Sequence, residues 1–210
     1  MKKTIITLSI LAGIILLAFG AYKIFLAPKV SQAFIDTHNK ISDLGKEVEN
    51  LTDPNKAPDL EKMINDKDYN GAIKAIDNTL ANENQASGKL KTIDSELAKL
   101  KVLSDKITNA KAKEASLKRI SYGEKENIAK TKYVALRTQL YEKMKEMMVR
   151  INKDEKLFTV ADGKAVEDLG KQITEIKSQA EKASSELDDI QSQYKAAEKE
   201  FMDAASLSKV

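Results

Sequence analysis

The sequence predicts an all-α protein, in which an N-terminal transmembrane or signal helix is followed by an antiparallel helical bundle with long coiled-coil helices. Three observations predict this class. The composition is typical of long helices, since 32% of the 210 residues are charged, 5% are aromatic and only three are proline. An uncharged run stands near the N-terminus. Apolar residues then recur at alternating spacings of three and four over most of the remaining chain.

The N-terminal segment, residues 1–29, is expected to be a membrane anchor or a signal segment. Residues 4–22 contain no charged side chain, and as a helix they would span about 28 Å, close to the thickness of a bilayer core. Lys2 and Lys3 precede this run, which favours a cytoplasmic N-terminus and export of the rest. The alternative is a cleaved signal peptide, since Ala18 and Gly20 are small residues at suitable positions before a cleavage site. Both interpretations export residues 30–210.

Residues 30–83 are expected to form short helices near the membrane. The first is predicted over 30–52, where one seam has the spacing of a heptad: Val30, Phe34, Thr37, Ile41, Leu44, Val48 and Leu51. Pro54 and Pro58 then end it, because proline cannot continue a helix. A short helix follows over 58–65, and another is predicted over 68–83.

Residues 84–210 are expected to form a long-helix coiled-coil bundle, with helices near 85–120, 124–153 and 164–205. The break between the first two is placed at residues 121–123, where Gly123 would take a left-handed conformation after the last helical turn. An uninterrupted helix through Gly123 is the alternative, because one glycine costs only about 1 kcal/mol. The sequence therefore leaves open whether 85–153 is one helix or a hairpin.

The last helix carries the strongest signal in the sequence. Its apolar and small residues keep the heptad spacing without a gap: Val166, Leu169, Ile173, Ile176, Ala180, Ala183, Leu187, Ile190, Tyr194, Ala197 and Phe201. A strict period of 3.5 residues predicts a left-handed coiled coil, either within the chain or between chains.

Composition also narrows the function. The formal net charge of +3 comes from the four lysines of residues 1–29, so the rest of the chain is nearly neutral and no nucleic-acid partner is expected. The chain has no cysteine, and His38 is its only histidine, which excludes thiolate and multi-histidine metal sites. No glycine-rich phosphate loop is present. We therefore expect no enzymatic activity, no cofactor and no small-molecule substrate.

One segment, residues 66–77, has a pattern of metal-ligand type. Its oxygen-bearing residues are spaced as D-x-D-x-N-G, with a further Asp at the twelfth position. This resembles a single EF-hand calcium loop, and the resemblance implies a weak metal site with side-chain oxygens from Asp66, Asp68, Asn70 and Asp77. Lys74 and the final Asp, where the family has Glu, depart from the pattern.

The same residues have a second interpretation. Asp68, Tyr69, Ala72 and Ile73 resemble the start of the second helix of a tetratricopeptide unit, in which Asp66 or Asp68 merely caps the helix. Backbone geometry distinguishes the two. An EF-hand loop keeps 66–74 non-helical, whereas a capped helix begins near Asp68.

These observations predict a membrane-tethered exported coiled-coil protein that acts as a spacer, scaffold or partner-binding module of a bacterial cell envelope. It would cross the cytoplasmic membrane once through residues 4–22, with its body outside the cytoplasm, or be secreted if that segment is cleaved. Its expected partners are the membrane and a protein bound through the coiled-coil seams. A second copy of the chain is one candidate for that protein. The alternative is a calcium-responsive exported helical binding protein that uses the loop at 66–77.

Overall fold

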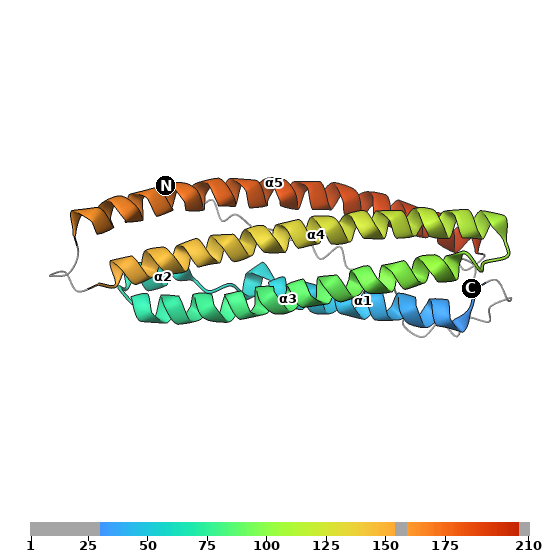
Figure 1. The fold of residues 1–210 in the computed structure, drawn as a ribbon, viewed down its shortest axis with the longest axis horizontal. Coiled ribbons are helices and arrows are strands. Elements are labelled where there is room, and N and C mark those ends of the chain that lie inside the picture. The colour runs from blue at the N-terminus through green and yellow to red at the C-terminus, as the bar shows by residue number, and fades with distance from the viewer. Residues whose placement is uncertain (1–29, 154–158, 206–210) are drawn as a thin grey trace.

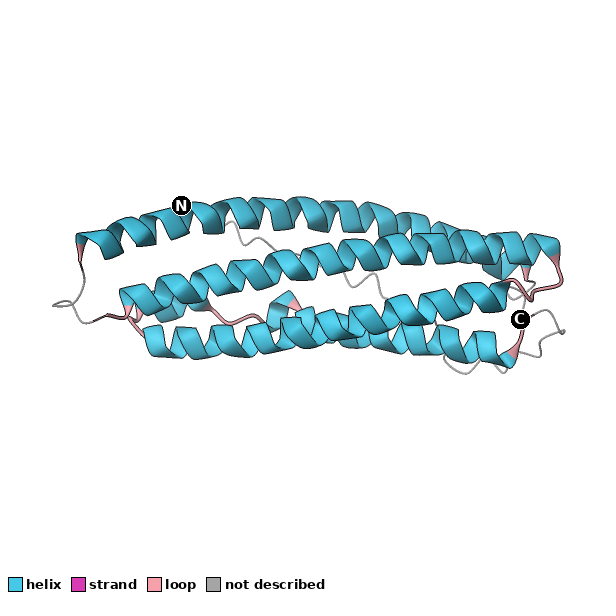
Figure 2. Ribbon diagram, viewed as in Figure 1, coloured by secondary structure: helices cyan, strands magenta, loops and turns pink. Residues whose placement is uncertain are grey.

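The computed structural model describes residues 30–153 and 159–205, and every regular element among them is helical. Figures 1 and 2 show an elongated bundle of long helices lying side by side. The elements are α1 (Gln32–Thr52), a short 3₁₀ turn (Pro54–Lys56), α2 (Leu60–Asn65), α3 (Tyr69–Ser104), α4 (Ala110–Ile151) and α5 (Val160–Ala204). The all-α bundle predicted from the sequence is therefore confirmed for the described residues, whereas the predicted anchor at 4–22 lies outside them.

The long helices run antiparallel. α4 packs against α3 on one side and α5 on the other, and α1 packs against α3. α1 covers only the half of the bundle that contains the end of α3, the start of α4 and the end of α5, as Figure 1 shows. α2 lies at the opposite end, beside the start of α3. With 45 residues, α5 is about 67 Å long and sets the length of the rod.

Each α-helix begins at a residue whose side chain accepts a hydrogen bond from a backbone N–H in its first turn. Ser31, Asp59, Asp68 and Asn109 do so for the first four helices, and Thr159 does so for α5. These are the residue types that satisfy the unpaired donors of a helix N-terminus. The position at which each helix starts is thus determined by a local capping residue.

The two predicted apolar seams face the core. Every seam position of α1 is buried or half-buried, and the same holds for all the seam positions of α5 from Val166 to Phe201. At the end where α1 starts, the Phe34 and Phe201 rings lie 5.7 Å apart, in one cluster with Ile107. The predicted burial of these seams is confirmed.

Two predicted breaks between helices, near residue 84 and at 121–123, are wrong, and the alternative of an uninterrupted helix through Gly123 is confirmed. α3 passes without interruption through residue 84, and α4 passes through 121–123, so the turn between them lies at 105–109 and residues 85–153 form a hairpin. Gly123 has no positive φ. Its role is close packing, because a Cβ atom there would lie 3.2 Å from Leu97 Cδ2 and 3.5 Å from Tyr194 Cε2. α5 also begins four residues before the predicted Lys164, at the cap formed by Thr159.

No helix within residues 30–153 and 159–205 combines the length and the apolar character needed to cross a bilayer.

Candidate functional site

The segment with the calcium-loop pattern is a helix–turn–helix junction. Asp66 ends α2, and Lys67 follows it in a left-handed conformation with φ of 59°. Asp68 then caps α3, its Oδ1 accepting a hydrogen bond of 2.9 Å from the N–H of Gly71. The helix begins at Tyr69, as the capping interpretation predicts, so most of the segment that an EF-hand would keep non-helical is helical.

The four oxygen-bearing residues of this segment have separate surroundings. Asn70 accepts a hydrogen bond of 2.8 Å from Asn152 at the end of α4. Asp77 lies two turns further along α3 and forms an ion pair of 2.6 Å with Lys145. Among the residues that the structure describes, no group of three or more acidic or histidine side chains is placed to hold a metal ion. In this fold the junction therefore ends α2 and caps the start of α3.

The unexpected feature of the core is a polar seam along α4. Its members are all buried and keep the heptad spacing of four and three: Arg119, Gly123, Glu126, Lys130, Tyr133 and Arg137. The periodicity of apolar residues does not reveal this seam, because four of its six residues are formally charged. Charged residues in a core need partners, since an unpaired buried charge is expensive.

Arg119 is the centre of the first polar cluster, in the half of the rod that α1 covers. Its guanidinium donates hydrogen bonds of 3.1 and 3.2 Å to the Tyr194 hydroxyl and contacts the His38 imidazole. The Glu198 carboxylate lies 3.7 Å away. The Phe201 ring also faces the guanidinium, with 5.5 Å between the guanidinium carbon and the ring centroid. Arg119 thus links α1, α4 and α5 through side chains.

His38, the only histidine in the sequence, lies beside the predicted seam of α1 and is buried. Burial lowers its pKa well below the ordinary 6.5, and the Arg119 guanidinium lowers it further. Burial raises the pKa of the neighbouring Glu198, against the opposing effect of Arg119. The imidazole is therefore neutral at pH 7 and serves as a hydrogen-bonding partner inside the bundle.

Glu126 and Lys130 continue the seam as an ion pair of 2.8 Å, and Gln191 of α5 donates a hydrogen bond of 3.4 Å to Glu126. Next to them lies a cavity of about 30 Å³, enough for one water molecule, between all four long helices. Tyr194 and Asn127 are among its lining residues. A cavity of this size does not admit an organic substrate.

The second polar cluster surrounds Arg137. Its guanidinium forms an ion pair of 2.8 Å with Glu83 of α3 and donates a hydrogen bond of 2.7 Å to the Thr52 carbonyl, at the end of α1. The rings of Tyr133 and Tyr141 lie 5.7 and 5.9 Å from the guanidinium carbon. Burial raises the pKa of Glu83 to about 7, although Arg137 acts in the opposite direction. This cluster fixes the end of α1 against α3 and α4.

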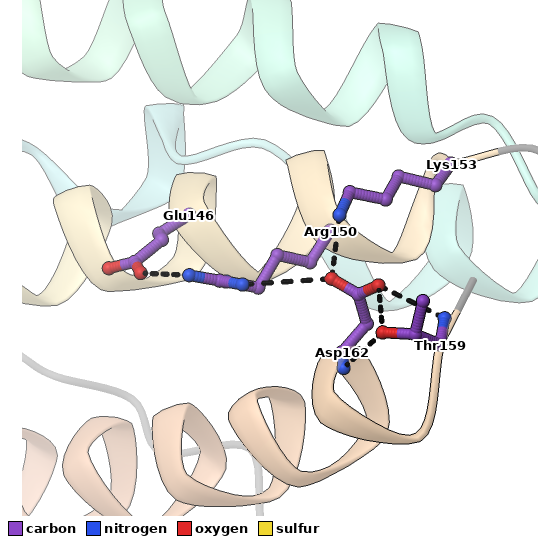
Figure 3. A network of polar contacts seen from close by, with 5 residues as sticks. All are labelled: Glu146, Arg150, Lys153, Thr159 and Asp162. Carbon is purple, nitrogen blue, oxygen red and sulfur yellow. Dashed lines mark hydrogen bonds and ion pairs between the residues drawn. The ribbon is translucent and has the colours of Figure 1, made fainter. Parts of the chain in front are cut away.

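A third network closes the turn from α4 to α5 (Figure 3). Thr159 and Asp162 exchange hydrogen bonds as a capping box, and Lys153 donates a hydrogen bond of 2.6 Å to the Asp162 carboxylate. Arg150 lies 3.7 Å from the same carboxylate and 3.2 Å from Glu146. The hydrogen bonds from Lys153 and Thr159 hold the pKa of Asp162 well below its usual range. The network orients α5 relative to α4.

A pair of adjacent acids and a group of three methionines have ordinary structural positions. Asp188 and Asp189 are exposed on the outer face of α5. Met148 is buried, and Met144 and Met147 are half-buried against the cluster that includes Ile76, so the methionines belong to the core at the α2 end. The sequence interpretation missed the three charged networks. The first two were signalled only by the heptad spacing of polar residues along α4, and the third by Thr159 and Asp162, which have the spacing of a capping box.

The described part of the chain is thus an antiparallel helical bundle whose central helix carries a buried polar seam. Comparison with protein-family models, with curated proteins and with solved structures finds no match to this chain.

Proposed function

We propose that this protein is an exported, membrane-tethered helical rod that acts as a spacer, scaffold or partner-binding module of a bacterial cell envelope. The support begins with the sequence. An uncharged run of bilayer length at residues 4–22 follows two lysines, and the bundle starts with Val30, eight residues after that run.

The observation that carries the proposal is where α1 begins. Gln32 lies at one end of the rod, and α2 and the start of α5 lie at the other (Figure 1). A tether attached before α1 would hold the rod by its end, so that the opposite tip reaches up to about 67 Å from the tethered end, the length of α5. In this arrangement α2 and the start of α3 belong to the tip, not to the membrane side.

The buried networks also favour a structural role. The Arg119, Glu126 and Arg137 side chains are paired with residues of neighbouring helices, and each pair fixes which helical turns lie opposite one another. Polar groups in a helical core are known to specify register in this way. A rod with fixed register can present a surface at a constant distance from a membrane. We include in the proposal that the protein is not an enzyme.

The location is tested with the full chain in cells. Full-length protein should sediment with membranes, and protease added outside the cytoplasmic membrane should degrade residues 30–210. Leu11→Arg with Ile15→Arg should move the protein to the soluble fraction, because two charges in the apolar run oppose insertion. Leu11→Ile with Ile15→Leu is the matched control and should stay in the membrane. Protection of 30–210 from external protease would contradict export.

The partner is tested by site-specific cross-linking, which is simple because the chain has no cysteine. A single Cys at exposed Asn65, in the tip, would carry the cross-linker, and one at exposed Ser185, on the outer face of α5, would be the comparison. A spacer that presents its tip should give adducts from position 65. Equal adducts from both positions would contradict recognition through the tip.

A further inference from the structure

The turn between α3 and α4 is unusual in its charge. The turn at 105–109 and the helix ends beside it, residues 101–113, contain four lysines and one acid, Asp105, which pairs with Lys113 at 3.0 Å. Lys101 lies 3.6 Å from Glu124. Lys106 and Lys111 are exposed and form no ion pair with any residue in the described part of the chain. With the exposed Glu114 included, residues 101–114 hold four lysines against two acids, so this end of the rod keeps an excess of positive charge.

The same turn exposes uncharged side chains and is held firmly. Val102 is 61% exposed, and Thr108 lies on the surface between the two free lysines. Beneath them Ile107 is buried, and the hydroxyls of Ser104 and Ser116 share a hydrogen bond of 2.8 Å across the turn. An exposed valine among lysines suits the boundary between lipid headgroups and acyl chains, where basic and apolar side chains bind together.

The position of the turn matches this chemistry. In Figure 1 the α3–α4 turn lies at the same end of the rod as the start of α1, and Val30 and Ile107 belong to one apolar cluster. Residues 23–30 separate the proposed membrane span from the bundle, and eight extended residues reach at most about 28 Å. The turn is therefore held within reach of the bilayer surface.

Two acids of α5 beside the turn are engaged, whereas the exposed Glu114 of α4 forms no ion pair with any described residue. Glu200, at the end of α5, forms an ion pair of 2.6 Å with Lys118, and Asp203 also has an interaction partner. The opposite tip has a net negative charge, since residues 59–68 contain four acids and two lysines. The charge of the rod therefore favours an anionic surface at the α3–α4 end.

We propose that the α3–α4 turn docks on anionic phospholipid headgroups of the membrane that holds the chain, with Lys106 and Lys111 as the contacting cations and Val102 as the apolar contact. This inference rests on the tether in the proposed function. A negatively charged leaflet attracts basic side chains over about one Debye length, roughly 8–10 Å. Docking would fix the direction in which the rod leaves the membrane.

The test uses full-length protein in vesicles of phosphatidylcholine alone or mixed with phosphatidylglycerol. A fluorophore on a single Cys at Thr108 reports on the turn, and one at Asn65 reports on the opposite tip. A quencher attached to lipid headgroups should quench the label at 108 several-fold more in the anionic vesicles than in the neutral ones. The label at 65 should not respond to lipid charge, and high salt should remove the difference.

The charge contacts are tested by Lys106→Gln with Lys111→Gln, which should remove the extra quenching at 108. The matched control is Lys62→Gln with Lys74→Gln, two exposed lysines at the other end, and it should keep the quenching. Flotation with the vesicles reports on the tether separately. Protein that floats but shows equal quenching at 108 in both lipids overturns the docking alone. Protein that fails to float overturns the tether, and the docking with it.

Discussion

The Glu83 carboxylate lies 2.8 Å from the Arg137 guanidinium, and Glu83 has no solvent-accessible surface. This pair connects α3 to α4, and the hydrogen bond from Arg137 to the Thr52 carbonyl adds the end of α1. Burial of both charges costs free energy that their attraction offsets only with good geometry. We therefore expect the pair to contribute more to the choice of register than to net stability.

Removing one member of this pair should be worse than removing both. We expect Arg137→Met to lower the free energy of unfolding by about 3–5 kcal/mol, because it leaves Glu83 buried without a partner. Glu83→Leu combined with Arg137→Met should lose less than Arg137→Met alone. Urea denaturation of the three proteins measures the difference. Additive losses would show that the two residues are not coupled.

The pair should also give a pH dependence. Burial raises the pKa of Glu83 from 4.5 to about 7, so between these values the folded protein binds more protons than the unfolded chain. The contribution of Glu83 to stability is therefore fully present below pH 4.5 and is lost as the pH rises through about 7. Glu83→Gln should remove this contribution. The test is the stability difference between wild type and variant from pH 5 to 8, which contradicts the assignment if it is constant.

Gly123 allows α4 to approach α3 and α5, because a Cβ atom at this position would lie 3.2 Å from Leu97. Gly123→Val should lower the free energy of unfolding by about 1–3 kcal/mol through overpacking. Gly88 of α3 is the control, since nothing lies within 4 Å of its Cβ position. Gly88→Ala should raise stability by up to about 1 kcal/mol through helix propensity. Thermal melting of both variants compares them, and a stabilised Gly123→Val would contradict close packing.

How much of this fold the sequence predicts depends on what faces the core. The α5 seam is apolar, and its burial was predicted at every position from Val166 to Phe201. The core face of α4 has the same spacing but carries Arg119, Glu126, Lys130 and Arg137, so the apolar period fades although the helix continues. Its charges are tolerated only because partners come from other helices, and such pairings are not visible in a local pattern.

The helix boundaries likewise follow local sequence signals at some positions and not at others. The turn at 105–109 contains neither glycine nor proline, the usual signals of a helix end, whereas Gly123 is such a signal and lies inside α4. Asn109 was an available signal, because asparagine is a preferred N-cap. At 66–77 the sequence supplied both interpretations, and Asp68 acts as a cap, as one of them predicts.

Asp68 should matter as a cap and not as a calcium ligand. Asp68→Ala should lower the free energy of unfolding by about 1 kcal/mol, because the N–H of Gly71 loses its acceptor. Asp68→Asn, which keeps an acceptor oxygen, should lose less. Millimolar calcium should leave the melting temperatures of wild type and Asp66→Ala with Asp68→Ala unshifted. A calcium-dependent rise in the melting temperature of the wild type alone would support the metal-binding alternative.

His38 offers a direct view of the buried Arg119 cluster, because it is the only histidine and its imidazole NMR signals need no assignment. Burial, and then Arg119, lower its pKa well below 6.5 in the folded protein. The unfolded chain therefore binds the extra proton first as the pH falls below 6.5, so His38 lowers stability toward acid pH. The charged and titratable groups that contact or adjoin this cluster include Arg119 and Glu126 from α4, and Tyr194 and Glu198 from α5. We expect the folded protein to show no His38 titration near pH 6.5, the urea-unfolded protein to titrate there, and His38→Gln to lose part of the acid sensitivity. A folded-state midpoint at or above 6.5 would mean that the imidazole is solvated, and that α1 does not pack on Arg119 in solution.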